Sequence, residues 1–159
     1  MAGCVFCGIV SGAEPAWVVW RDERHVAFLD RSPLDEGHVL VVPRRHAVTL
    51  LDLDPAEAGA LGEASHRTAY LLRDRLHPHG LKIQQCNGRA AGQVVMHLHV
   101  HLIPRWAARR SPMGRRWTGR RVSDQVLAEV HARIIGARAP DPGICGLDHL
   151  VEGRRPGAG

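Results

Sequence analysis

The amino-acid sequence predicts an α+β fold in which an antiparallel sheet is covered by one long helix. Three observations support this prediction. Apolar segments of strand length lie on both sides of a single long helical pattern, polar turns join the first of these segments, and three histidines alternate with apolar residues from residue 97 to residue 101. With 159 residues, 45% of them hydrophobic and 23% charged, the chain is long enough for one domain with a hydrophobic core.

Strands are predicted on both sides of the long helix. Residues 16–21 and 25–30 form a predicted hairpin, and residues 38–43 are nearly all apolar, as expected for a central strand. Residues 81–87 form the next strand, and the loop at residues 88–93 leads to the histidines. Glycines in that loop would allow backbone amides to approach a phosphate closely.

The long helix has clear start and stop signals. Asp54 suits the N-cap, Pro55 suits the first helical position, and Glu57 is placed to reach back to the cap. Apolar residues keep the helical period until proline and glycine within residues 77–80 end it. A second helix with a serine cap is predicted for residues 123–138.

The three histidines belong to a predicted strand at residues 97–102. Side chains at i, i+2 and i+4 share one side of a strand, so His97, His99 and His101 line one face with Cβ atoms roughly 7 Å apart. Pro104 is expected to end this strand because it has no N–H to donate. An imidazole acts as nucleophile, proton carrier or metal ligand, and the row alone leaves all three chemistries open.

Cysteines at the amino terminus form a Cys-x-x-Cys pair, Cys4 and Cys7, with two interpretations: half of a tetrahedral zinc site, or a redox pair. A redox pair is expected to follow a strand and to begin a helix. No strand pattern stands before Cys4 in this sequence, so zinc is the favoured interpretation. Cys145 has no evident partner. No signal-like segment and no apolar run of membrane length is present, so we expect a cytoplasmic protein without a membrane span.

The charge of the chain is basic, with a net charge of +5 that favours anionic partners such as nucleotide phosphates or nucleic acid. Nearly all the basic residues are arginines, and Lys82 is the only lysine. Between residues 105 and 121, arginines are interleaved with Trp106 and Trp117. This segment is either a solvated surface or an arm that clasps phosphates and stacks a base. The sequence from Pro140 onward predicts a loosely held tail.

Residues 97–103 read His-φ-His-φ-His-φ-φ, where φ is apolar, and this pattern resembles the signature of the histidine triad superfamily of nucleotide hydrolases and transferases. Other family motifs occur in the same order: Cys-x-x-Cys at the start, Phe28-Leu29-Asp30, residues 37–43 with His46 behind them, Asn87, and Gly92-Gln93. The resemblance implies a five-stranded antiparallel sheet with one long helix in residues 1–105. Residues 106–159 would form the arm, the second helix and the tail, and the protein would be a homodimer.

The resemblance also implies roles for single residues. His99 would attack the α-phosphate of a nucleotide ester, anhydride or phosphoramidate and form a nucleotidyl-histidine intermediate that water resolves. His101 would donate to a phosphate oxygen. Asp30 would hold the ribose hydroxyls of an adenine nucleotide conjugate, and Phe28 would form part of the base pocket. The phosphate-side groups would come from four loop or strand-end residues: Asn87, Gly92, Gln93 and Val94.

Zinc-containing members of the superfamily resemble this chain in their Cys-x-x-Cys start. In those members, positions that match Cys4, Cys7, His46 and His97 hold a structural zinc ion. If His97 is a zinc ligand, the proton for the leaving group must come from His101, Gln93 or water. Arg31 stands where the family more often has an apolar residue, which suits a more anionic substrate such as a dinucleoside polyphosphate.

Within the leading hypothesis, dinucleoside polyphosphates and nucleoside phosphoramidates are rival substrates. A second hypothesis is binding without turnover, in which the histidine pocket senses a nucleotide or the basic arm binds RNA or DNA. A third is hydrolysis by a catalytic zinc ion that the three histidines hold.

Overall fold

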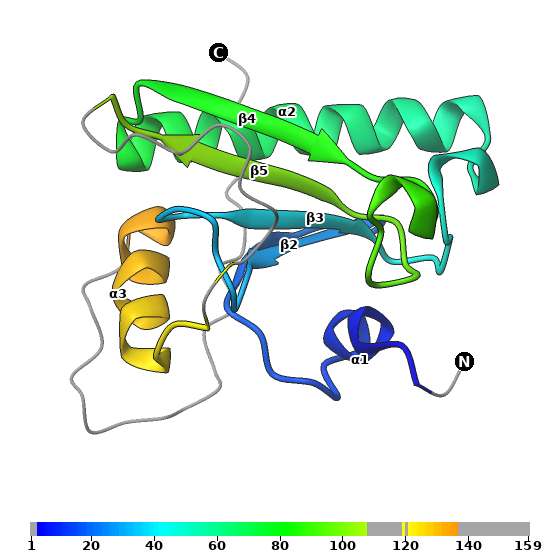
Figure 1. The fold of residues 1–159 in the computed structure, drawn as a ribbon, viewed down its shortest axis with the longest axis horizontal. Helices are drawn as coiled ribbons and strands as arrows, with labels where there is room; N and C mark the ends of the chain where they lie inside the picture. Colours follow the sequence, from blue (N-terminus) through cyan, green and yellow to red (C-terminus); the bar gives the residue numbers. More distant parts are fainter. Residues whose placement is uncertain (1–2, 108–118, 120, 137–159) are drawn as a thin grey trace, which may run out of the picture.

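The computed structural model describes residues 3–107, 119 and 121–136. Its elements follow in the order α1 (Val5–Ser11), β1 (Val18–Arg21), β2 (His25–Leu29), β3 (Val39–Pro43), α2 (Pro55–Leu76), β4 (Gly80–Gln85), β5 (Val100–Arg105) and α3 (Asp124–Ile135), with 3-10 turns at Leu50–Asp52 and Arg89–Ala91. The predicted α+β fold is therefore confirmed (Figure 1).

The strands form one antiparallel five-stranded sheet in the order β1-β2-β3-β5-β4. All five residues of β3 are buried, and β3 has a neighbour on each side, as its apolar sequence predicts. Within this sheet, Leu40 pairs with both Phe28 on β2 and His101 on β5. This register brings the end of the first hairpin next to the histidines, although they lie far apart in the sequence.

The last strand differs from its prediction at both ends. It begins at Val100 and not at His97, because the Leu98 N–H donates to the carbonyl of Ala47, a residue outside the sheet, at 2.7 Å. The prediction that Pro104 ends the strand is wrong, since Pro104 pairs with Leu81 on β4. Pairing between β3 and β5 extends only to Leu102, so the missing N–H of the proline breaks no ladder on that side.

Helix α2 begins and ends where the local chemistry predicts. The Asp54 carboxylate accepts from the Glu57 N–H at 2.8 Å, and the Asp54 N–H donates to the Glu57 carboxylate at 3.0 Å, which completes a capping box. His77 ends the helix in a left-handed conformation with φ 51°. The inward face of α2 packs on the sheet with seven buried residues: Ala60, Leu61, Ala64, Ser65, Thr68, Leu72 and Leu76.

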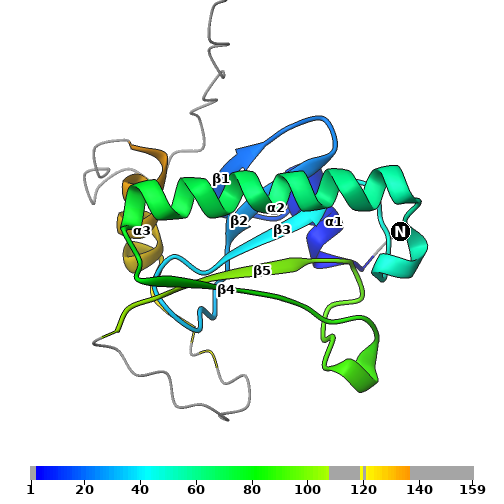
Figure 2. The same cartoon turned by 90° about the horizontal axis from the view of Figure 1, so that it is seen from above.

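Helix α3 joins the same core as α2. Leu127, Val130 and Ile134 are buried in that core, and His131 donates from Nε2 to the Val18 carbonyl on β1 at 2.7 Å. Ser123 caps the helix as predicted, and the helix ends at Ile135. Figure 2 shows α3 next to the C-terminal end of α2.

The opposite face of the sheet carries α1 (Figure 1), a helix that the sequence pattern does not predict. Phe6 on α1 packs into a second buried cluster with Val26, Phe28, Leu40 and Val42. This smaller layer surrounds the histidines. The arm between residues 105 and 121 lies mostly outside the described residues, as does the whole tail with Cys145. Within the described part of the chain, no helix has the length and apolarity needed to cross a membrane.

Candidate active site and metal site

His99 is buried under α1 and is held in one tautomer. Its Nδ1 donates to the backbone carbonyl of His97 at 2.7 Å, so the assigned hydrogen-bond pattern leaves a lone pair on Nε2. Burial is the main cause that lowers the pKa of His99, which keeps the ring neutral near pH 7. His99 therefore presents an uncharged, oriented imidazole nitrogen, which is the form that acts as a nucleophile.

His101 bears the opposite tautomer because of a chain of hydrogen bonds that begins at the backbone. The Leu34 N–H donates to Nδ1 of His38 at 3.2 Å, so His38 carries its proton on Nε2. His38 Nε2 then donates to His101 Nδ1 at 2.9 Å, which places the His101 proton on Nε2. Burial is the largest cause that lowers the pKa of both rings to about 3. Both rings are neutral, and His101 is a proton-bearing donor beside His99.

His38 is a site residue that the sequence reasoning missed. It is fully buried directly before β3, and its imidazole lies between His101 and Asp30. The signals in the sequence are a histidine at the start of an otherwise apolar strand and its place in the family motif at residues 37–43. Its partners become evident only once β3 and β5 pair.

Asp30 lies at the end of β2 beside the histidine chain. One carboxylate oxygen lies 3.5 Å from Nδ1 of His38, and the other accepts from the Ser32 N–H at 2.8 Å. Burial is the main cause that raises the pKa of Asp30. The carboxylate is half-buried, so it retains oxygens that can accept from a ligand hydroxyl.

An apolar wall stands next to Asp30. The ring of Phe6 meets Phe28 edge-on with centroids 5.4 Å apart and meets His99 at 5.2 Å. Phe28 is a predicted site residue, whereas Phe6 is not, because its place depends on the unpredicted helix α1. Phe6 is 7% and Phe28 3% exposed, so a ligand at this wall would contact only the small exposed part of the two rings.

Four N and S ligands converge between α1 and the sheet. Potential ligand atoms of Cys4, Cys7, His46 and His97 all lie within 4.8 Å of one another. His97 donates from Nε2 to the Pro43 carbonyl at 2.8 Å, which leaves the Nδ1 lone pair facing Cys4 Sγ at 3.5 Å and Cys7 Sγ at 3.6 Å. Two thiols and two imidazoles, one of them oriented by a backbone carbonyl, match the chemistry of a closed tetrahedral zinc site.

The remaining predicted site residues lie on the loops around the histidines. The Gln93 side chain is buried, and within the described residues its hydrogen bonds are to backbone groups: Oε1 accepts from the Gly88 N–H at 2.7 Å, and Nε2 donates to the Val48 and Val95 carbonyls at 2.6 and 3.1 Å. Asn87 Oδ1 accepts from the Leu50 N–H at 2.7 Å. These two side chains hold the loop between β4 and β5 in place.

Three residues that were predicted to bind substrate, Arg31, Gly92 and Val94, are exposed to solvent. Arg31 donates to the Pro15 carbonyl at 3.1 Å, Gly92 has φ 91°, and Val94 is 83% exposed. The left-handed φ of Gly92 explains the requirement for glycine there.

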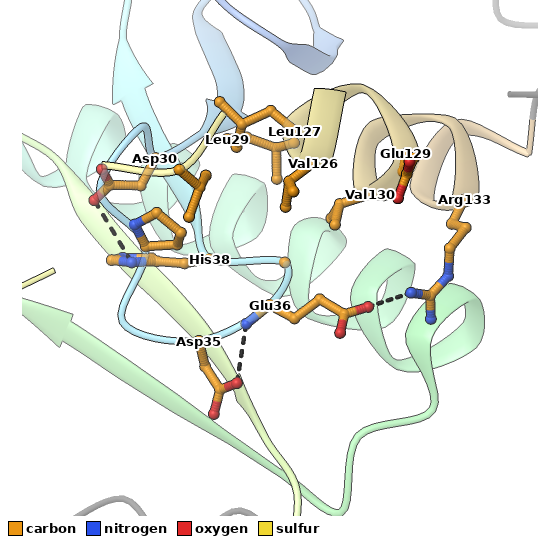
Figure 3. A pocket seen from close by; sticks show the side chains of 13 residues that line it. Leu29, Asp30, Asp35, Glu36, His38, Val126, Leu127, Glu129, Val130 and Arg133 are labelled. Atoms are coloured by element: carbon orange, nitrogen blue, oxygen red, sulfur yellow. Dashed lines mark hydrogen bonds and ion pairs between the residues drawn. The ribbon is translucent and has the colours of Figure 1, made fainter. Parts of the chain in front are cut away.

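A cavity of about 420 Å³ lies beside the histidines, between α3 and the loop that joins β2 to β3 (Figure 3). Asp30 and His38 border it, but neither His99 nor His101 is among its lining residues. Its walls combine apolar residues of α3 with the carboxylates of Asp35 and Glu36. The cavity is therefore a neighbour of the histidine site.

Comparison with known proteins identifies the family. Residues 11–108 match the HIT domain. An uncharacterized HIT-like protein of Mycobacterium tuberculosis is 36% identical over 140 residues, which cover 82% of this chain and 94% of that protein. The Arabidopsis thaliana adenylylsulfatase HINT3 is 33% identical over 102 residues, which cover 64% of this chain and 52% of that protein.

A solved structure adds agreement on the fold. The crystal structure of a Zn-bound histidine triad family protein from Mycobacterium smegmatis is similar to this structure, with a TM-score of 0.69 and 32% sequence identity. The aligned region covers 84% of this chain and 94% of the Mycobacterium smegmatis chain. Four features indicate the same family: the histidine signature, the five-stranded sheet, the Cys/His cluster and the match over residues 11–108. The chain belongs to the HIT domain family.

Proposed function

We propose that this protein is a nucleotide hydrolase or transferase that cleaves nucleotide conjugates at the α-phosphate, with His99 as the nucleophile. The observation that carries the proposal is the hydrogen bond from His99 Nδ1 to the His97 carbonyl, because it directs a neutral Nε2 lone pair away from the backbone. His101 lies next to this ring, with centroids 4.7 Å apart, and supplies an N–H donor for a phosphate oxygen.

The reaction then has two steps. In the first, His99 Nε2 forms a bond to the α-phosphorus, the bond to the leaving group breaks, and the leaving group takes any proton that it needs from water, while the neutral His101 ring keeps its Nε2 proton and donates a hydrogen bond to a phosphate oxygen. The substituted His99 ring is cationic, and its Nδ1–H bond to the His97 carbonyl strengthens accordingly. In the second step water attacks phosphorus and loses a proton to solvent, the P–N bond breaks and returns its electron pair to His99 Nε2, and a nucleoside monophosphate leaves.

The hydrogen bonds of the site exclude some candidate proton donors for the leaving group. His97 uses Nε2 on the Pro43 carbonyl and directs Nδ1 to the thiols, so it has no proton to give. The Gln93 amide is fully engaged with backbone carbonyls, which favours a positioning role. Water remains, because the neutral His101 ring could give up its Nε2 proton only by becoming an imidazolate. The same orientation of His97 disfavours a catalytic zinc ion held by the three histidines.

The nucleoside half of the substrate would bind at the apolar wall and Asp30. The base would pack against Phe6 and Phe28, and Asp30 would accept from the ribose hydroxyls. The name of the adenylylsulfatase relative supports a substrate with an adenylyl group and an anionic leaving group. Adenine nucleotide conjugates are therefore the first substrates to test.

A structural zinc ion would be held by Cys4, Cys7, His46 and His97. When bound, zinc would fasten α1 to the sheet by four bonds and supply no reacting group. Phe6 lies between the two cysteines in the sequence, so the same bonds would hold the apolar wall in place.

A homodimer is proposed through the exposed edge of β4. β4 has one strand neighbour, and Ile83 on it is 55% exposed. An unpaired strand edge with an exposed apolar side chain is suited to pair with a second copy. Light scattering coupled to gel filtration tests this, and a lower mass for Ile83→Glu would support the β4 edge as the contact.

The test of function compares the wild type, His99→Ala and the control His66→Ala on diadenosine tetraphosphate and an adenosine phosphoramidate. His66 is exposed on α2. Nucleoside monophosphate release by the wild type and the control, but not by His99→Ala, is expected. Retained release by His99→Ala would refute the nucleophile assignment. Nucleotide binding without release by any protein would favour the alternative of a non-catalytic binding protein.

A further inference from the structure

Lys82 lies on the same face of the sheet as the reacting histidines. On the paired strands β4 and β5, Gln84 is opposite His101 and Lys82 is opposite Ile103. Paired residues share a face, and so do residues two apart on one strand. Lys82 is therefore the diagonal neighbour of His101, at a backbone separation of about 7–8 Å that a long side chain spans. Its positive charge is among the causes that lower the pKa of His101.

The ammonium group of Lys82 is available for a ligand. Lys82 is exposed and forms no ion pair with another described residue. Arg105, the other cation on this face of the two strands, lies 3.4 Å from the Asp35 carboxylate. If a second copy pairs its backbone with β4, side chains on the two faces remain directed away from the strand plane.

The borders of the histidine site differ in charge. On the side of β2 and β3 stand Asp30 and the cavity of Figure 3, with the carboxylates of Asp35 and Glu36 in its wall. Glu36 pairs with Arg133 and Asp35 with Arg105, and Arg31 on this side donates to the Pro15 carbonyl. The described lining still holds more carboxylates than guanidinium groups, with Asp30, Asp35, Glu36 and Glu129 against Arg133. A chain of phosphates is therefore disfavoured there. On the side of β4 the described border offers the ammonium of Lys82. If the nucleoside binds at Phe6, Phe28 and Asp30 as proposed, an anionic leaving group would extend toward β4.

We propose that Lys82 binds the anionic leaving group and is a specificity residue for polyphosphate conjugates. This inference rests on the proposed function for its turnover test. As the bond to the α-phosphorus breaks, negative charge accumulates on the departing phosphate, and the ammonium of Lys82 stabilises it. The amine that leaves from a phosphoramidate carries no such charge and gains nothing from Lys82.

The experiment compares Lys82→Met, which keeps the length of the side chain without its charge, with Lys82→Arg and the control Arg44→Met. Arg44 is an exposed cation at the far end of β3. For Lys82→Met, kcat/KM should fall about tenfold on diadenosine tetraphosphate and less than about twofold on adenosine phosphoramidate. Lys82→Arg should restore most of the loss, and added salt should shrink the difference.

Equal losses on both substrates, or no loss on either, would overturn the assignment. A binding measurement in the His99→Ala background keeps the inference testable if turnover is absent. There, the affinity for diadenosine tetraphosphate relative to AMP should fall about tenfold when Lys82→Met is added. An unchanged ratio would refute the role of Lys82, whereas a reduced ratio without wild-type turnover would refute only the proposed reaction.

Discussion

His38→Phe is the substitution that tests the histidine chain most sharply. It keeps a ring of similar size in the fully buried position before β3 and removes the Nε2–H that donates to His101 Nδ1 at 2.9 Å. Without this donor, the tautomer that places a proton on His101 Nε2 is no longer enforced. His101 would then fail to present its N–H to the phosphate in part of the molecules.

The expected magnitude follows from that single bond. Removing one partner of a buried hydrogen bond costs about 1–3 kcal/mol. If this cost falls on the transition state, kcat/KM decreases about 5- to 150-fold. The change should appear mainly in kcat, because His38 does not line the apolar wall on which the nucleoside would bind.

The assay measures steady-state hydrolysis and thermal unfolding together for His38→Phe and for the control His25→Phe. His25 is a buried histidine on β2 that pairs with Pro43, away from His101. Both variants should lose stability, but only His38→Phe should lose kcat. A folded His38→Phe protein with wild-type kcat would show that the hydrogen-bond chain does not support the reaction.

Two further predictions concern the metal site and pH. Cys7→Ser or removal of zinc by a chelator should loosen α1 and weaken nucleotide binding by about 10- to 150-fold, because Phe6 loses its anchor and one buried phenylalanine contributes about 1.5–3 kcal/mol. Hydrogen exchange of residues 5–11 and nucleotide titration check this, with Cys86→Ser as the control; unchanged exchange would contradict it. Acidification should destabilise the protein, because burial lowers the pKa of His25, His38 and His101 in the folded state. The unfolded chain therefore binds more protons as the pH falls below about 6.5, and stability declines from there toward the folded-state pKa of about 3 for His38 and His101. A urea midpoint that stays constant between about pH 7.5 and about pH 5 would refute this.

Local chemistry explains which parts of the fold were predictable. The capping box of Asp54 and Glu57 spans only four consecutive residues, so the start of α2 can be predicted from the sequence. Helix α1 has only seven residues, and its N-cap residue Cys4 makes no side-chain cap. Such a short helix depends on tertiary packing, here through Phe6, and therefore leaves no periodic signal.

The candidate site divides in the same way. The histidine signature and the Cys-x-x-Cys pair are local patterns, and the structure brings Cys4, Cys7, His46 and His97 together as the resemblance implies. His38 and Phe6 are different, because their contacts depend on strand pairing and on helix packing across the sheet. Gln93 stays a predicted site residue, and its hydrogen bonds to the Gly88 N–H and to the Val48 and Val95 carbonyls depend on loop packing that no local pattern indicates.

The central claim is that His99 forms a covalent bond to the α-phosphate. The most direct measurement is mass spectrometry of protein mixed briefly with an adenosine phosphoramidate and digested at alkaline pH, where phosphohistidine bonds persist. The account predicts an adenylyl group on the peptide that contains His99, absent from His99→Ala and decaying as AMP appears. Turnover without any adenylylated peptide, or adenylylation that persists in His99→Ala, would contradict it.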